Sequence, residues 1–249
     1  IAASRPVAMV AVRLSDVALD DQATRISYGL LNLTHRTGHD TPEPLVPGER
    51  YRVSVQLNAM AQALPPGHRL RVAISTSYWP LAWPPPEPVR LSVFTGSSKL
   101  VLPIRPTREP DEVSLRPFDE PEGAEPIAVS QVLPGEERWT VTRDLVGYQS
   151  ALEVVKDLGA VCFDDIDLTV TRRAYERYSW VGSDVDSVRG NTEWVMGFER
   201  GDWKISTVTR TVLTSTVTDF HLRAELDAYE GDKRVASYNW DHTVPRDLV

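Results

Sequence analysis

The stretch Trp203-Lys204-Ile205-Ser206-Thr207-Val208-Thr209-Arg210-Thr211-Val212-Leu213 decides the fold class. It is rich in threonine and valine, and β-branched side chains favour an extended backbone. Turn residues precede it at Arg200-Gly201-Asp202 and recur at Glu230-Gly231-Asp232, and both triplets are typical of tight hairpins. The pattern therefore predicts strands at residues 203–213 and 218–228 that pair as an antiparallel sheet.

The same sheet extends to both sides of this stretch. Apolar, β-branched and aromatic residues predict further strands at residues 139–145, 151–156, 166–180, 193–200 and 233–244. Within residues 145–158 a helix is an alternative, because Leu145, Tyr148, Leu152 and Val155 have helical spacing; Gly147 and the pair Val154-Val155 favour a strand. Residues 136–249 are therefore predicted to form a long antiparallel β-meander.

The first part of the chain also shows strand patterns, but shorter ones. They predict strands at residues 7–12, 25–33, 50–57, 70–76, 89–95 and 99–104, separated by proline and glycine turn signals. Short strands at this spacing are typical of a β-sandwich or jelly roll. The predicted fold is thus all-β: a jelly-roll β-sandwich over residues 1–107, followed by the β-meander.

Residues 108–135 interrupt the strand pattern and are predicted to be a linker. Prolines recur through them, and acidic residues cluster at Asp119, Glu120, Glu122 and Glu125. Such a composition buries too little apolar surface to order itself. The charge changes across this linker, from +4 over residues 1–107 to −12 over residues 108–249, which indicates two different surfaces.

Composition excludes several classes of protein. The net charge of −8 argues against nucleic acid or an anionic membrane as the main partner. No run approaches the roughly 18 apolar residues of a transmembrane helix. The single cysteine, Cys162, excludes an internal disulfide and fits a reducing compartment, so we expect a cytoplasmic location.

The sequence shows no catalytic motif, and we predict no catalytic residue, cofactor or metal ion in this chain. Gly-x-Ser-x-Gly, the nucleophile turn of α/β-hydrolases, is missing. His35 and His39 are four residues apart, but Gly38 and nearby prolines place them in a loop rather than on a helix. The acidic run at residues 164–167 lacks the pattern of a calcium loop.

The segment from Tyr78 to Pro88 is the strongest candidate for a binding surface. It holds five prolines and three aromatic residues, Tyr78, Trp79 and Trp83. Proline stiffens the backbone, so such a loop presents its aromatic rings at little cost in entropy. We interpret the three aromatic residues as the wall of a cleft or as a docking surface; the alternative is that they cap the core of the sandwich.

Several blocks resemble a known family, the C-terminal non-catalytic domain of X-Pro dipeptidyl-peptidase and cocaine-esterase-like serine hydrolases. The blocks are Ser4-Arg5-Pro6-Val7, Arg13-Leu14-Ser15-Asp16-Val17, Gly29-Leu30-Leu31-Asn32-Leu33-Thr34-His35-Arg36, Pro44-Leu45-Val46-Pro47-Gly48, Pro66-Gly67-His68-Arg69-Leu70 and Tyr78-Trp79-Pro80. The later motifs Trp139-Thr140-Val141-Thr142-Arg143-Asp144 and Leu226-Asp227-Ala228-Tyr229-Glu230-Gly231 resemble a C-terminal extension in one branch of that family.

The resemblance implies a galactose-binding-like jelly roll that packs against an N-terminal α/β-hydrolase domain of the same polypeptide. The catalytic Ser, Asp and His would lie upstream of Ile1. The chain would then help to shape the substrate cleft or the assembly of a dipeptidyl-peptidase or acyl esterase. Two alternatives stay open: a carbohydrate-binding module, because the jelly-roll shape is shared with sugar binders, and a structural or homo-oligomerisation domain.

Overall fold

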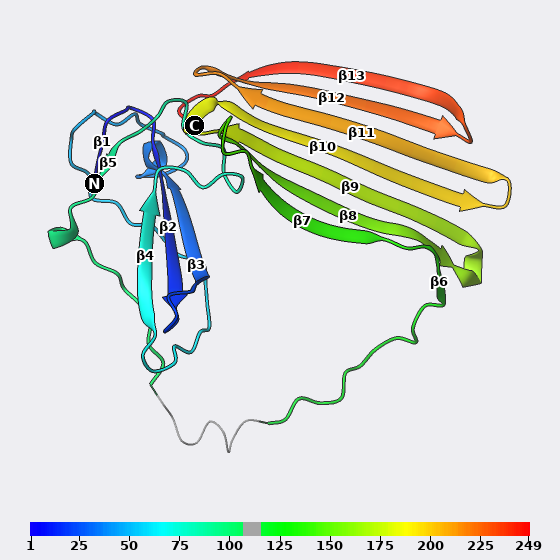
Figure 1. The fold of residues 1–249 in the computed structure, drawn as a ribbon, viewed down its shortest axis with the longest axis horizontal. Coiled ribbons are helices and arrows are strands. Elements are labelled where there is room, and N and C mark those ends of the chain that lie inside the picture. The colour runs from blue at the N-terminus through cyan, green and yellow to red at the C-terminus, as the bar shows by residue number, and fades with distance from the viewer. Residues whose placement is uncertain (107–115) are drawn as a thin grey trace.

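A computed structural model describes residues 1–106 and 116–249 (Figure 1). Its regular structure is almost entirely strand, so the predicted all-β class is confirmed. The described residues also contain three short 3-10 turns, η1 (Leu33–His35), η2 (Thr95–Ser97) and η3 (Asp164–Ile166). Within the described residues, no helix is long and apolar enough to cross a membrane.

The first unit, residues 1–106, contains two small antiparallel sheets. One has the strand order β3-β2-β4, formed by β2 (Met9–Val17), β3 (Ala23–Asn32) and β4 (Arg69–Ser75). The other pairs β1 (Ala2–Ala3) with β5 (Leu91–Ser92). The galactose-binding-like form of the jelly roll stays a prediction.

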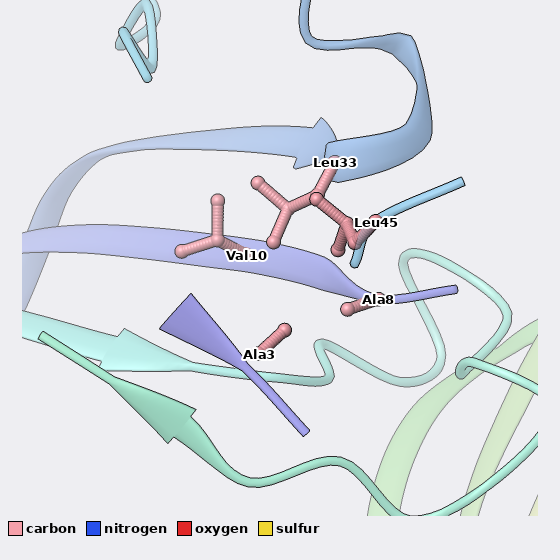
Figure 2. Close-up of a cluster of buried hydrophobic side chains, with 5 residues drawn as sticks. All are labelled: Ala3, Ala8, Val10, Leu33 and Leu45. Carbon is pink, nitrogen blue, oxygen red and sulfur yellow. The ribbon is translucent and has the colours of Figure 1, made fainter. Parts of the chain in front are cut away.

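A compact hydrophobic cluster holds the first unit together (Figure 2). Ala3, Ala8, Val10, Leu33 and Leu45 are all buried there, and Leu33 is completely inaccessible. They come from β1, from β2 and the residue before it, from η1 and from the loop at Leu45, so the cluster joins segments that are distant in sequence. Burying a leucine stabilises a fold by about 1.5–3 kcal/mol relative to leaving it exposed.

The strand predicted at residues 50–57 is extended but forms no regular ladder. Its side chains alternate between half-buried and exposed as predicted, and Tyr51, Val53 and Val55 pack against the cluster. The segment lies close to β3, and glycine at position 29 of β3 permits this approach. A Cβ atom there would be only 2.2 Å from the carbonyl oxygen of Gln56. The strand predicted at residues 99–104 is not formed.

The long sheet contains eight antiparallel strands in the order β13-β12-β11-β10-β9-β8-β6, with β7 paired to β8 beside β6. Its members are β6 (Val129–Leu133), β7 (Glu136–Arg143), β8 (Gln149–Phe163), β9 (Leu168–Val181), β10 (Asp184–Arg200), β11 (Trp203–Ser215), β12 (Asp219–Glu230) and β13 (Lys233–Pro245). The long meander is confirmed. The helical alternative for residues 145–158 is wrong, because β8 occupies most of that range.

The strand register gives the long sheet one apolar and one charged face. Residues directly opposite each other on paired strands share a face. The apolar face carries aromatic residues of five strands, including Trp139, Tyr178, Trp180, Trp194, Phe220, Tyr238 and Trp240. The charged face carries ion pairs between neighbouring strands, such as Arg210 with Glu193 at 2.9 Å and Arg223 with Asp241 at 3.2 Å.

The predicted linker reaches the long sheet at its end remote from the first unit (Figure 1). Residues 116–128 have no regular structure and are exposed, and β6 lies inside the predicted linker range of residues 108–135. The rest of that range, residues 108–115, lies outside the described residues. The division at residues 107 and 135 stays a prediction.

Candidate functional site

The aromatic loop, residues 78–88, lies on the apolar face of the long sheet at the end nearest the first unit. The ring of Trp79 contacts Tyr178 of β9 edge-on, with centroids 5.8 Å apart. The ring of Trp83 meets Phe220 of β12 in the same way, also at 5.8 Å. Trp79 and Trp83 contact each other at 4.8 Å. The loop therefore docks one unit of this chain onto the other.

A polar contact supports the docking of Trp83. Its indole Nε1 donates a hydrogen bond to Oγ of Ser215, at 2.8 Å, and Ser215 is buried at the end of β11. A buried indole N–H needs such a partner. The indole N–H of Trp83 therefore has its hydrogen-bond partner within the chain.

Arg246 fixes the same contact from the other side of the loop. Arg246 directly follows the last residue of β13 and is only 5% exposed. The guanidinium donates to the carbonyl oxygen of Pro84 at 2.6 Å, and to Ser215 Oγ at 3.4 Å. It also lies over the ring of Phe220, 4.8 Å from the centroid. Burial lowers the pKa of Arg246 below its usual value, and the negative charge of Asp186 counteracts this shift.

The last residues of the chain return to the first unit. The carbonyl oxygen of Leu248 accepts hydrogen bonds from the side chains of Asn32, at 2.9 Å, and Thr34, at 2.8 Å. Thr34 is completely buried. The contacts of Leu248 join the two units over more than 200 residues of sequence, and the contact of Arg246 with Pro84 spans 162. Figure 1 shows the C-terminus beside the first unit.

A cleft of about 490 Å³ opens where the two units meet. The first unit contributes Arg13 of β2 and the aromatic loop, including Tyr78 and Trp79. The long sheet contributes Trp180 of β9 and the β9–β10 turn around Gly182. Its volume falls in the range of small-molecule sites.

The wall formed by the first unit is basic and aromatic. The guanidinium of Arg13 lies 5.2 Å from the ring centroid of Tyr78, and Arg25 donates a hydrogen bond to the Tyr78 hydroxyl. Such cation–π contacts hold rings in place. Two buried nitrogen atoms here, Nε of Arg13 and Nε1 of Trp79, have no hydrogen-bond partner in the part of the chain that the structure describes.

Tyr178 borders the docked loop, and its pKa departs from the ordinary value of a tyrosine. Burial, together with a hydrogen bond of 2.7 Å from its hydroxyl to Glu176, raises the pKa of Tyr178 to about 12. The shift follows because both effects favour the neutral phenol. Tyr178 therefore acts as a neutral hydrogen-bond donor that holds a ring against Trp79.

The three predicted binding residues have two different positions. Tyr78 and Trp79 line the cleft, whereas Trp83 is absent from its lining and anchors the loop on the sheet. Their role in binding stays a prediction. Sequence reasoning missed Arg13, Trp180 and Arg246. Of these three residues only Trp180 has a local sequence signal, because it is an aromatic residue two positions before the turn glycine Gly182.

The other sequence candidates form no comparable site. His35 and His39 place their Nδ1 atoms 3.0 Å apart. The acidic run at residues 164–167 forms the turn η3 between β8 and β9. Across residues 1–106 and 116–249, no group of three or more His, Cys, Asp or Glu side chains is arranged to hold a metal ion.

Comparison with known families accounts for the first part of the chain. Residues 1–114 match the family model described as the X-Pro dipeptidyl-peptidase C-terminal non-catalytic domain. Comparisons with curated proteins and with solved structures find no match. The match covers the six motif blocks identified in the sequence and most of the described contacts of the first unit. The resemblance to this family that the sequence motifs predict is therefore confirmed over residues 1–114.

Proposed function

We propose that this chain is a non-catalytic part of a serine hydrolase of the X-Pro dipeptidyl-peptidase or acyl esterase type, where it shapes the substrate cleft. The observation that carries this proposal is the family match over residues 1–114. A C-terminal non-catalytic domain implies an N-terminal catalytic domain in the same polypeptide, and we propose an α/β-hydrolase domain as that partner. The sequence of this chain lacks a Gly-x-Ser-x-Gly motif, which supports the proposal that the catalytic serine belongs to the partner domain.

The junction between the units supports a shaping role. The aromatic loop is stiffened by its prolines and held by Trp83 and Arg246, so its exposed part has a defined position. A surface ordered before docking loses less entropy on association than a mobile one. Tyr78 and Trp79 would then limit which substrates reach a neighbouring catalytic centre.

The test compares three proteins: this chain alone, the catalytic domain alone, and the two joined. The substrates are an X-Pro anilide and a p-nitrophenyl ester. We expect no turnover by this chain, and a different KM for the joined protein than for the catalytic domain. Turnover by this chain that a serine-directed inhibitor blocks would contradict the proposal, as would identical kinetics with and without the chain.

A structural or oligomerisation role is the second candidate, and the apolar face of the long sheet favours it. Trp139 is 61% exposed, Val141 71%, Tyr238 59% and Trp240 42%. Exposed apolar patches beyond a few hundred Å² mark interaction sites. Sedimentation analysis of the chain tests this role: Trp139→Ser with Trp240→Ser should weaken any self-association, whereas Arg223→Ser on the charged face should not.

The carbohydrate-binding alternative has less support. Stacking on a sugar needs an open ring face, and Trp83 already packs against Phe220 and Trp79. Glycan-array binding that depends on Trp79 would favour this alternative over the proposed function.

A further inference from the structure

We propose that the cleft between the aromatic loop and the β9–β10 turn binds a small carboxylate with an aromatic or apolar body. The first observation is the pair of unpartnered donors in its lining. Nε of Arg13 and Nε1 of Trp79 are both buried, and neither has a hydrogen-bond partner among residues 1–106 and 116–249. Buried donors without partners are rare, and leaving one unsatisfied is costly. Two such donors beside one cleft indicate a ligand with oxygen acceptors.

The second observation is the charge of this wall. Across the described residues, Arg13 forms no ion pair, and neighbouring Arg25 is engaged with the Tyr78 hydroxyl rather than with an acid. The cleft also holds two carboxylates, but each has a partner. Glu87 pairs with Arg5 at 3.3 Å, and Asp184 accepts the backbone N–H of Asp186 at 3.0 Å. On the wall formed by the first unit, the uncompensated charge is therefore that of Arg13, which favours an anionic ligand. Asp184, on the long sheet, keeps its negative charge, because a hydrogen bond from a backbone N–H does not neutralise it.

The chemistry of the donors selects a carboxylate among anions. The planar guanidinium of arginine matches the geometry of a carboxylate. One guanidinium edge and one indole N–H offer donors for its two oxygens. Phosphate sites commonly add backbone N–H groups of a glycine-rich loop or a helix N-terminus, and the lining of this cleft belongs to neither kind of element.

The other residues that line the cleft indicate that the rest of the ligand is aromatic or apolar. Tyr78 and Trp180 provide rings, and Pro85 and Val188 provide further apolar surface. A volume of about 490 Å³ accommodates a molecule of one ring and a short chain. This inference concerns the chain alone and does not depend on the proposed partner domain.

Benzoylglycine is a suitable probe, since it joins a phenyl ring to a carboxylate, and its neutral amide is the matched control ligand. Titration of the full chain is followed by calorimetry and by the NMR signal of the Trp79 indole N–H, assigned by its loss in Trp79→Phe. We expect benzoylglycine to bind at millimolar or lower concentration and to move that signal. The amide should bind at least about tenfold more weakly, because a hydrogen bond to a charged group is lost.

Variants of the donors provide the decisive comparison. Arg13→Met and Trp79→Phe should each weaken binding about tenfold or more, and Arg13→Lys should do the same while keeping the positive charge. Matched controls are Arg234→Met and Trp203→Phe, whose side chains lie far from the cleft on the long sheet. Circular dichroism confirms that each variant is folded; if Arg13→Met is not, Arg13→Lys decides. Absence of binding, equal binding of the amide, or unchanged binding by both donor variants would overturn the proposal.

Discussion

Replacing Arg246 by methionine should uncouple the two units of this chain. Methionine keeps an apolar stem of similar length but removes every donor of the guanidinium. Two of the lost hydrogen bonds are short: the one to the Pro84 carbonyl at 2.6 Å and the one to Val249 O at 2.9 Å. The bonds to Ser215 and to the Thr216 carbonyl are longer, at 3.4 and 3.3 Å.

The magnitude follows from these contacts and from the burial of the charge. A hydrogen bond from a charged donor contributes about 1.5–3 kcal/mol, so the two short bonds together are worth about 4 kcal/mol. Burial offsets part of this, since it already lowers the pKa of Arg246, and methionine carries no desolvated charge. We expect a net loss of about 2 kcal/mol in the free energy of unfolding.

Urea unfolding, followed by tryptophan fluorescence and by circular dichroism, measures this loss. The matched control is Arg234→Met, which breaks an exposed ion pair with Asp227 at 3.3 Å and should cost about 0.2–1 kcal/mol. After uncoupling, the unfolding transitions measured by fluorescence and by circular dichroism should no longer coincide. Tryptophan fluorescence reports on the junction, whereas circular dichroism reports on the strands of both units. Equal losses for Arg246→Met and Arg234→Met, with coincident transitions, would refute the assignment of Arg246 as the link between the units.

Three further predictions follow from the same structure. Trp83→Phe keeps the ring contact but removes the hydrogen bond to Ser215, so it should cost about 1 kcal/mol in unfolding free energy by urea titration. Tyr178 has its pKa raised to about 12 in the folded chain against about 10 when unfolded. Its contribution to stability is therefore complete below pH 10 and is lost as the pH rises towards 12; tyrosinate absorbance should show one late-titrating tyrosine, which is missing in Tyr178→Phe. A Glu-selective protease should cut first between Glu120 and Glu125, because these residues are exposed and outside any strand; mass spectrometry of the first fragments checks this, and early cuts inside the long sheet would contradict it.

The long sheet was predictable because its signals are local. The β-branched stretch in β11 favours extended chain whatever it contacts. Gly201 and Gly231 lie in the hairpin turns at φ angles of +57° and +58°, which glycine adopts without strain. Consecutive strands joined by such turns pair with their neighbours, so sequence order predicts the order in the sheet.

The first unit was less predictable because its strands pair over long distances. Residues 50–57 have the alternation of a strand, but an alternating pattern predicts burial and not a hydrogen-bonding partner. Around Tyr51 the segment exchanges two backbone hydrogen bonds with Ile1, and further along Asn58 donates to Tyr28, without a continuous ladder. The prediction for this segment was correct in its burial and wrong in its pairing.

The candidate site was predictable only in its aromatic loop. Proline and tryptophan density singled out Tyr78 and Trp79 without any knowledge of the fold. Arg13 and Trp180 are 167 residues apart in sequence, and no local pattern relates them. Arg246 is one of 27 basic residues, and its importance arises from burial beside carbonyl groups, which the sequence does not display.

The two tryptophans of the loop have separable roles, and this separation links the docking of the units to the cleft. Trp83 and Arg246 fix the loop on the long sheet but are absent from the lining of the cleft. Trp79 lines the cleft, and its ring position depends on contacts with Trp83 and Tyr178. The cleft has walls from both units, so any loosening of the docked loop changes its shape. A change at the Arg246 link should therefore weaken ligand binding without touching the ligand, whereas a change at Trp79 should weaken binding and leave the units joined.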